Sequence, residues 1–416
     1  MYKGANSANI AKAVTLITFS RIGDYFQFTA LVILIKNLGG DAKSIGILLV
    51  LHQLPVILMS GLGAKIGRNI DQRKYLAVCD CIRAILTLGF IATNQLWLLY
   101  FFAFVHYSIS ASCSPVALSM LPKIVEPQHI PKINMLTSVA FTGAAGLGGV
   151  LSGLIISSLS LNLAFVIDAF TFLVSACCVL SLKYVKNQNP QKSVKDKFNK
   201  SWQKVWKYLI EKKKLFIIFL MPISQGGFAG ILWVTCLNFA TNNKAGTESA
   251  NSIAFVNTAL MFGNVLGPVI FHRFFYKGAE IKTLNVLKNA NLVRLFLCLI
   301  ITGLYRLDIF FSESSIMFVV FWFFFLMCIS GLGAINFLSI KNFVHAHVSE
   351  NRQKEFFSIF LILGALCFSI SSFLTSIIID NGNLTYVHLW YLMSIVSLFL
   401  YSCWRIGMGY CRMLWN

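Results

Sequence analysis

Charged residues are scarce in this chain of 416 residues: they make up 12% of the total, and only 15 residues are acidic. Soluble proteins average about 25% charged residues, so this scarcity excludes an ordinary water-soluble domain. Hydrophobic residues reach 57%. The composition therefore predicts a chain whose main solvent is not water.

Signatures of common enzymes and metal sites are also missing. The sequence has no Gly-x-Ser-x-Gly elbow and no Gly-Lys-Ser/Thr phosphate loop, so neither an enzyme nor an ATP-driven pump is expected. The cysteines of 79-CDC-81 and 177-CC-178 lack the Cys-x-x-Cys spacing of zinc and redox sites. His345 and His347 have no matching set of acidic partners. We expect no cofactor and no metal.

Apolar runs of about 18 to 25 residues, long enough to cross a hydrocarbon core of about 30 Å, recur along the chain. The first run has no small-residue cleavage site after a short apolar core, so we expect a retained helix rather than a signal peptide. The twelve candidate spans are 9–36, 45–66, 75–94, 96–122, 133–158, 161–183, 214–241, 249–275, 284–304, 315–344, 355–379 and 385–409.

Positive charge concentrates in alternate connections between the spans. Eleven lysines fall between Lys183 and Lys214, whereas 94-NQLW-97 and 159-LSLN-162 carry no charge. By the positive-inside rule this pattern predicts a multi-pass inner-membrane protein with both termini in the cytoplasm. The basic loop suits anionic membrane lipid, with an amphipathic helix around 201–210, and we expect no nucleic-acid partner.

The spans divide into two halves, residues 1–185 and 214–416, joined by a basic cytoplasmic linker at 186–213. The second span and 263-GNVLGPVIFHRFFYK-277 both run through glycines to a basic turn. Duplicated six-helix halves are typical of transporters whose substrate site lies midway across the bilayer. The predicted fold class is all-α and integral to the membrane, with twelve transmembrane helices in two pseudo-symmetric halves.

Three segments resemble a known family: 23-GDYFQFTALVILIKNLGGDAKSIGILLVLHQLP-55, 115-PVALSMLPKIV-125 and 164-AFVIDAFTFLVSA-176. Together they are similar to the major facilitator superfamily, in the branch of macrolide-efflux and enterobactin-exporter permeases. The resemblance is strongest in the first half and fades in the second. It implies the major facilitator fold and secondary transport, and it names no substrate.

The segment 61-GLGAKIGRNIDQRK-74 departs from this family where its members carry an aspartate. Counting from Pro55, the resemblance places that aspartate, which latches the cytoplasmic side, on Arg68. We expect either a charge-swapped latch or a simple positive-inside charge at this position. The predicted cytoplasmic gate comprises Arg68, Asp71, Arg73, Lys74, Asp80, Arg83, Glu350 and Glu355.

Ionisable side chains inside apolar spans are costly and tend to be functional. Asp24 lies near the middle of the first span, and Arg21 is on the same helical face. The two form either a permanent structural ion pair or a proton-coupling site, in which Asp24 alternately binds a proton and its partner. We expect Asp80 and Arg83 to brace the third span near its cytoplasmic end, and Asp168 to have a structural role.

For the substrate cavity, the resemblance implies the first, fourth, seventh and tenth helices. The spacing of His106, Ser110 and Ser114 predicts one polar stripe, although His106 alone suits a packing role as well. The predicted cavity residues are Gln27, His106, Ser110, Ser114, Gln225, Trp233, Asn238 and Asn336. In the fifth span, Gly146 and Gly149 predict close packing of neighbouring helices.

We therefore predict a secondary transporter that exports an amphiphilic small molecule, siderophore-like or drug-like, by alternating access in exchange for protons. We expect a monomer whose partners are the substrate, protons and membrane lipid. A lysophospholipid flippase is the alternative within transport. A non-transporting membrane sensor or assembly partner is the alternative from another class, but it would not need the ionisable groups of Arg21 and Asp24 at the midplane.

Overall fold

The computed structural model describes residues 2–66, 70–184, 213–241, 247–274, 280–306, 316–347, 350–381, 390, 392–398 and 401. Helix is the only regular secondary structure in these described ranges. The α-helices are α1 (Tyr2–Asn37), α2 (Ala42–Ile66), α3 (Gln72–Gly89), α4 (Leu96–Met120), α5 (Ile130–Ser158), α6 (Leu161–Leu180), α8 (Lys213–Thr241), α9 (Thr247–Phe274), α10 (Glu280–Arg306), α11 (Ile316–His347) and α12 (Glu350–Asp380).

The first eleven predicted spans each coincide with one of these helices. The twelfth predicted span lies largely outside the described residues, although 392–398 within it is helical. The amphipathic helix expected around 201–210 lies wholly outside them. The predicted all-α fold class is confirmed.

Local chemistry sets several helix ends. Gly39 turns the chain between α1 and α2 with a φ of 78°, a conformation that favours glycine. The Asp41 carboxylate then accepts a hydrogen bond from the Ser44 amide at 2.8 Å. Asp71 and Ser160 cap the first turns of α3 and α6 in the same way. Each cap satisfies an amide that has no partner within its own helix.

The described chain forms two compact units. Unit 1 comprises Met1–Lys192 and Leu237–Thr258, and unit 2 comprises Ser193–Cys236 and Ala259–Asn416. The short segment Leu237–Thr258, which the sequence analysis placed in the second half, thus groups with the first. The exact boundaries of the two predicted halves stay a prediction.

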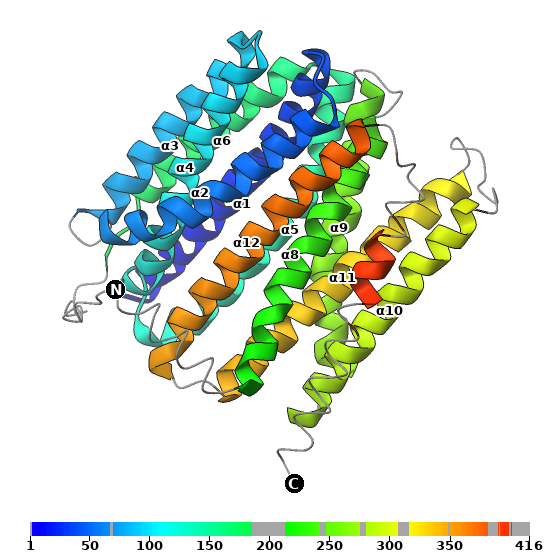
Figure 1. Cartoon of the computed structure of the whole chain (residues 1–416). Helices are drawn as coiled ribbons and strands as arrows, with labels where there is room; N and C mark the ends of the chain where they lie inside the picture. The colour runs from blue at the N-terminus through cyan, green and yellow to red at the C-terminus, as the bar shows by residue number, and fades with distance from the viewer. Residues whose placement is uncertain are drawn as a thin grey trace. The chain divides into compact units, whose positions relative to one another are not determined.

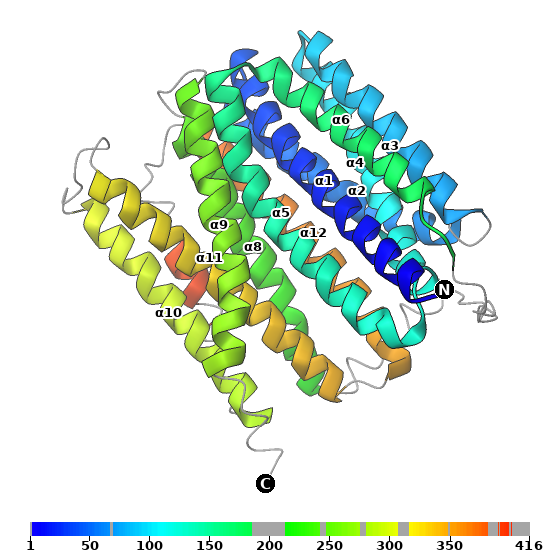
Figure 2. The same cartoon turned by 180° about the vertical axis from the view of Figure 1, so that it is seen from behind.

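In unit 1, α1 packs against both α5 and α6, and α3 packs against α4 and α6 (Figures 1 and 2). In unit 2, α10 packs against α11. Two glycines of α9 come close to α11: a Cβ on Gly263 or Gly267 would meet backbone atoms of Met327 or Gly331. Small residues therefore permit close helix contact in unit 2, as expected for a membrane protein.

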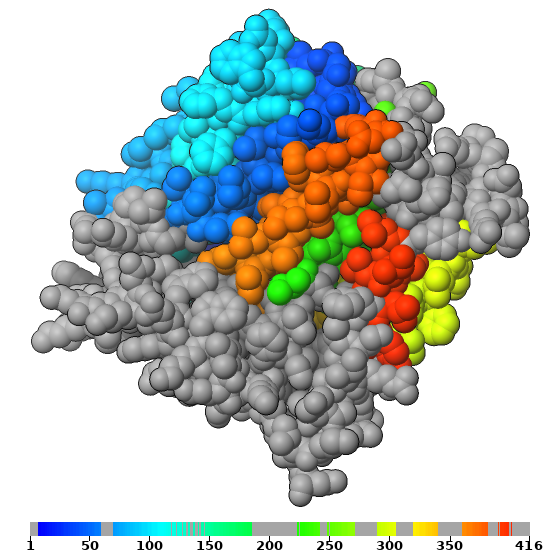
Figure 3. All heavy atoms as spheres, in the orientation of Figure 1, coloured from blue at the N-terminus to red at the C-terminus, as the bar shows by residue number. Residues whose placement is uncertain are grey.

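The helices place polar groups inside and apolar groups outside. On α3, Val78 and Ile85 are 57% and 69% exposed, whereas Asp80 and Arg83 are buried. In unit 2, α12 is visible as the orange ridge in Figure 3, and its Ile370 and other large apolar residues are exposed. Seven of the described helices are long and apolar enough to cross a membrane. This inverted pattern is that of a multi-pass membrane protein.

Candidate functional site

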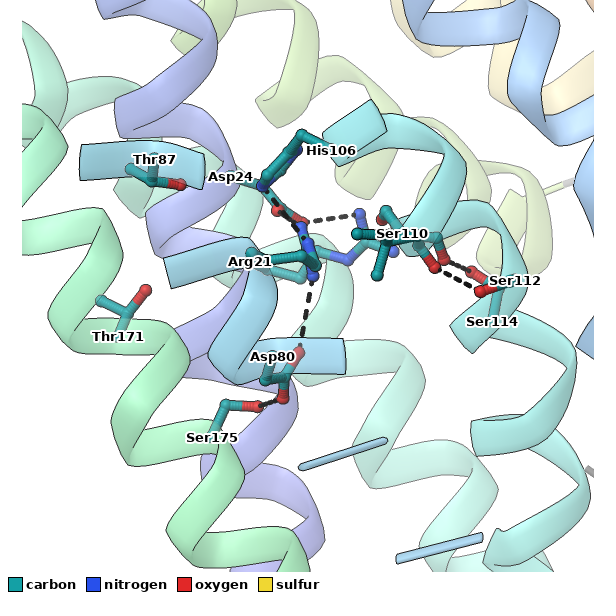
Figure 4. A network of polar contacts seen from close by, with 12 residues as sticks. Arg21, Asp24, Asp80, Thr87, His106, Ser110, Ser112, Ser114, Thr171 and Ser175 are labelled. Atoms are coloured by element: carbon teal, nitrogen blue, oxygen red, sulfur yellow. Dashed lines mark hydrogen bonds and ion pairs between the residues drawn. The ribbon is translucent and has the colours of Figure 1, made fainter. Parts of the chain in front are cut away.

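An ion-pair network in unit 1 joins charged side chains of α1 and α3. Asp24 Oδ1 accepts a hydrogen bond from Arg83 Nη2 at 2.6 Å, and Asp24 Oδ2 accepts one from Arg21 Nη1 at 3.2 Å (Figure 4). The side chains of Arg21, Asp24 and Arg83 are 33%, 20% and 5% exposed, respectively. Asp24 therefore links a buried guanidinium to a more accessible one.

Arg83 is the point where four helices meet. Its Nη1 lies 3.7 Å from Asp80 Oδ1, and its Nε donates to His106 Nε2 of α4 at 3.3 Å. The guanidinium carbon also lies 4.0 Å from the centre of the Phe172 ring of α6. Because these contacts use carboxylates, an imidazole and an aromatic face, the buried charge of Arg83 is well compensated.

The hydrogen bond from Arg83 determines the state of His106. Since Arg83 Nε donates, His106 Nε2 must carry a lone pair, and the ring proton resides on Nδ1. A doubly protonated His106 would have no lone pair for this bond and would face the Arg83 charge. The geometry therefore favours a neutral, hydrogen-bonded packing role for His106.

Two further carboxylates lie in the same interior. Ser175 donates to Asp80 Oδ2, and Thr87 donates to Asp168 Oδ2 at 3.3 Å. Asp168 Oδ1 is buried and has no hydrogen-bond partner among the described residues. A Cβ at Gly23 of α1 would collide with this atom and with the Thr171 hydroxyl, so a larger residue there would require these side chains to shift. Hydroxyl groups of α3 and α6 thus hold two acids in this interior, and Figure 4 shows the contact of Ser175 with Asp80.

This arrangement adds a contact that the sequence analysis did not include. Asp80 and Arg83 were assigned to the cytoplasmic gate, and Arg83 also makes a short ion pair with Asp24. Their role in a gate stays a prediction. The expected pairs Arg21–Asp24 and Asp80–Arg83 are both present. Sequence reasoning missed the contact that joins them, although all four residues share one signal, a charge inside an apolar run.

Other predicted cavity residues of unit 1 have varied surroundings. Gln27 is buried, and its Nε2 has no hydrogen-bond partner among the described residues. Ser110 is half-buried and Ser114 exposed, on the α4 face that His106 begins. His52, which the sequence analysis missed, places its ring centre 4.7 Å from that of Tyr107. A histidine inside the apolar second span was the available signal.

The remaining cavity candidates are divided between the units. Asn238 is buried in unit 1, whereas Gln225, Trp233 and Asn336 belong to unit 2. Gln225 accepts a hydrogen bond from Arg294, and Asn336 donates one to Asn291. A single cavity lined by all these residues stays a prediction.

Two of the predicted gate residues tie the start of α3 to the chain just after α6. Arg73 Nη2 lies 3.0 Å from Asp71 Oδ2, and Arg73 Nη1 donates to the Leu182 carbonyl at 2.8 Å. The Tyr184 hydroxyl donates to Asp71 Oδ1 at 3.1 Å. These hydrogen bonds, led by those from Arg73, lower the pKa of Asp71 to about 2.

The remaining gate candidates are Arg68, Lys74, Glu350 and Glu355. Lys74 is exposed. Arg68 lies outside the described residues, as do the side chains of Glu350 and Glu355 at the start of α12. The charge-swapped latch therefore stays a prediction.

The glycines of α5 lie at close helix contacts. A Cβ on Gly149 would lie 3.2 Å from Thr258 Oγ1 and 3.3 Å from Asn257 Cβ, both in α9. A Cβ on Gly148 would lie 3.1 Å from backbone atoms of α1. Gly146 is half-buried on the same helix. Glycine therefore lets α5 closely approach α1 and the part of α9 that belongs to unit 1.

Metal ligation finds no support in the described part of the chain. No group of three or more His, Cys, Asp or Glu side chains there could hold an ion. The side chains of His345 and His347 lie outside the described residues.

Comparisons with known proteins agree with this architecture. Among curated relatives, the chain is 28% identical over 163 residues to the uncharacterized MFS-type transporter YfmI of Bacillus subtilis (strain 168), which is 38% of this chain and 39% of that protein. It is 23% identical over 166 residues to YfiS of the same organism, 40% of each chain. The chain thus matches about two fifths of the length of these relatives.

Solved structures share the fold over nearly the whole chain. The nucleoside transporter NupG superposes with a TM-score of 0.70 at 14% identity, covering 97% of this chain and 99% of NupG. A bacterial homolog of the human lysosomal transporter Spinster superposes with a TM-score of 0.68 at 13% identity, covering 97% of both chains. At such identities the likeness shows the fold alone.

The family comparison is decisive. The Major Facilitator Superfamily model matches residues 13–225, which is more than half of the chain and includes the Asp24–Arg83 network. The chain belongs to the Major Facilitator Superfamily.

Proposed function

We propose that this protein is a secondary active transporter that exports an amphiphilic small molecule by alternating access, in exchange for protons. The observation that carries the proposal is the position of Asp24, whose two carboxylate oxygens pair with Arg21 and Arg83 inside a membrane-spanning bundle. The family membership and the curated relatives, which are MFS-type transporters, support transport as the activity.

Protonation of Asp24 would change the network electrostatically. With Asp24 and Asp80 ionised, two carboxylates balance Arg21 and Arg83. A proton on Asp24 leaves Arg83 only its longer ion pair with Asp80 and neutralises the carboxylate that Arg21 contacts. The hold of α1 on α3 then weakens, so proton binding favours one conformation over another.

The partial exposure of Asp24 gives a proton a route to this site. Asp80 and Asp168 are buried and bonded to serine or threonine hydroxyls, which suits structural roles. Asp24 is the most exposed acid of the network, and its neighbour Arg21 is more exposed still. We therefore assign the proton-coupling role to Asp24 and a positioning role to Arg83.

The substrate class, direction and setting are part of the proposal. Resemblance to macrolide-efflux and enterobactin-exporter permeases supports a siderophore-like or drug-like molecule leaving the cytoplasm. The lysine-rich segment from Lys183 to Lys214 supports cytoplasmic termini and contact with anionic lipid. We propose a monomer as the working form.

The test combines metabolite profiling with reconstituted transport. Metabolite profiling would identify compounds that are depleted from the medium when the protein is deleted. Transport of these compounds by the purified protein would then be measured in liposomes, with and without an imposed pH gradient. We expect gradient-driven accumulation by the native protein. Asp24→Asn should keep downhill exchange but lose accumulation, because the amide mimics the protonated carboxyl.

Three outcomes would contradict the proposal. Full accumulation by Asp24→Asn would show that Asp24 is structural. Absence of any flux with every profiled compound would favour a non-transporting sensor, whereas flux of lysophospholipid alone would favour a flippase.

A further inference from the structure

Unit 2 contains a buried arginine that no carboxylate among the described side chains compensates. Arg294 of α10 is 1% exposed, within the apolar stretch Asn289–Leu304. Its Nη2 donates to Gln225 Oε1 of α8 at 3.3 Å, and its guanidinium carbon lies 4.6 Å from the centre of the Phe228 ring. Its Nε and Nη1 have no hydrogen-bond partner among the described residues. Donors buried in this way are rare in folded proteins.

Arg83 is the corresponding arginine of unit 1, and it has carboxylate partners of the kind that Arg294 lacks among the described residues. In both units the arginine follows a polar residue by three positions, as 80-DCIR-83 on α3 and 291-NLVR-294 on α10. Arg83 Nη2 binds Asp24 Oδ1 of α1, the first helix of its half, and Arg294 Nη2 binds Gln225 Oε1 of α8. The second half thus keeps the arginine and has an amide in place of each carboxylate.

The second half also lacks a counterpart of Arg21. Where Arg21 precedes Asp24 by three positions, Pro222 precedes Gln225. Among the side chains of unit 2 that the structure describes, Asp380 is the only acid, and it is exposed at the end of α12. Among the described side chains of unit 2, Arg294 is therefore a buried cation without an acidic partner. A buried charge is stable only when it is paired, so an anion from outside the described residues is required.

A glycine and a second polar group lie beside Arg294. Gly333 of α11 faces the guanidinium, since a Cβ there would lie 3.5 Å from Arg294 Nη2. Asn336, one turn further along α11, donates to Asn291 Oδ1 at 3.0 Å, and its own Oδ1 is buried without a partner among the described residues. A cationic donor of α10 and an amide acceptor of α11 thus lie on two helices that pack together, and the donor contacts the aromatic ring of Phe228.

We propose that Arg294 binds the anionic head group of the substrate, a carboxylate or a phosphate ester carried by an amphiphile, and that Asn336 Oδ1 accepts a hydrogen bond from the same molecule. This inference rests on the proposed function for its place in transport, and it narrows the exported class to anionic amphiphiles. Gln225 acts as a positioning residue that orients the guanidinium.

Binding tests the proposal without transport. The purified full chain in a neutral detergent would be titrated with octyl phosphate and octanoate, and with octanol and octyltrimethylammonium as neutral and cationic controls. We expect saturable binding of an anionic probe and a raised thermal unfolding midpoint. Arg294→Gln should weaken that binding about tenfold or more, because a charge-assisted hydrogen bond is lost. The two anionic probes distinguish a carboxylate site from a phosphate site.

Gln225→Glu provides a variant that keeps the arginine. It restores the carboxylate of unit 1, so Arg294 should pair internally, the ligand-free unfolding midpoint should rise, and anion binding should weaken about tenfold or more. Gln128→Glu makes the same change of charge on an exposed residue and should leave binding unchanged. If Arg294→Gln fails to fold, Gln225→Glu decides the question.

The outcomes separate this inference from the export proposal. Equal anion binding by the native protein and Gln225→Glu, equal binding of neutral and anionic probes, or no anion binding at all would overturn the role of Arg294. Anion binding that depends on Arg294, together with absence of proton-driven flux, would overturn export and leave the anion site standing.

Discussion

At the scale of single residues, the two buried arginines differ in what surrounds them. Arg83 meets Asp24, Asp80 and the imidazole of His106. Arg294 meets an amide and an aromatic ring. Because desolvation penalises both guanidinium groups, the compensated one can hold helices together, whereas the uncompensated one needs a ligand. The chemistry of each unit thus depends on a few substitutions between carboxylate and amide.

The unequal exposure of the two partners of Asp24 yields a prediction on stability. Arg83→Gln should destabilise the protein more than Arg21→Gln, because Arg83 is 5% exposed and Arg21 is 33% exposed. Removing one partner of a buried ion pair costs about 3–5 kcal/mol. The thermal unfolding midpoint and folded yield in detergent would measure both changes. Equal losses of stability would contradict the role of Arg83 as the residue where four helices meet.

At the scale of helices, the cluster of Asp71, Arg73 and Tyr184 fastens the start of α3 to the chain after α6. Tyr184 lies 4.4 Å from the Arg73 guanidinium carbon, measured to the ring centre. The side chains of Arg73 and Asp71 are each 27% exposed, so solvent screens their ion pair and the pair contributes little by itself. The Arg73 bond to the Leu182 carbonyl adds the link between the helices.

Acid should loosen this cluster. The folded-state pKa of Asp71 is about 2, below the ordinary 3.8, so its stabilisation is present above about pH 4 and is lost as the pH falls through about 2. The native protein should therefore exceed Asp71→Asn in thermal midpoint near neutral pH, and the difference should shrink between about pH 4 and about pH 2. A difference that stays constant with pH would show that the Asp71 charge is not the cause.

Close packing of α5 gives a prediction for one glycine. Gly149→Leu should lower the folded yield, because even a Cβ would lie 3.2 Å from Thr258 Oγ1 and 3.3 Å from Asn257 Cβ. Val150→Leu is the matched control, since Val150 is 39% exposed on the same helix. Size-exclusion profiles of the two variants in detergent would compare them. Normal yield and monodispersity for Gly149→Leu would mean that α5 can move away.

The helices themselves could be predicted from the sequence, but their contacts could not. Hydrophobic length alone placed a helix over 96–122, and α4 covers Leu96–Met120. The pair Arg21–Asp24 followed from spacing on one helix. Asp24 and Arg83, in contrast, are 59 residues apart, and the packing of α1 and α3 against α6 in unit 1 brings them together. Arg294 could have been found, because it is a charge inside a predicted span.

At the scale of the whole molecule, the excess of positive charge is the main guide to orientation. The formal net charge is +20, and eleven lysines concentrate between Lys183 and Lys214. The connection 159-LSLN-162 between α5 and α6 has no charge. Because lysine and arginine resist translocation, these two regions should lie on opposite sides of the membrane.

Reporter fusions would test this orientation. Alkaline phosphatase fused after Leu159 should be active, because that connection would face the outside, and the enzyme fused after Lys192 should be inactive. Green fluorescent protein, which fluoresces only when folded in the cytoplasm, should give the reverse pattern. The fusions at the two sites share the membrane helices up to α5. Differences in expression between the sites are controlled by comparing phosphatase activity with fluorescence at each site. Phosphatase activity after Lys192 together with fluorescence after Leu159 would reverse the topology. It would place the basic segment outside, remove its contact with anionic lipid of the inner leaflet, and contradict the proposed cytoplasmic position of both termini.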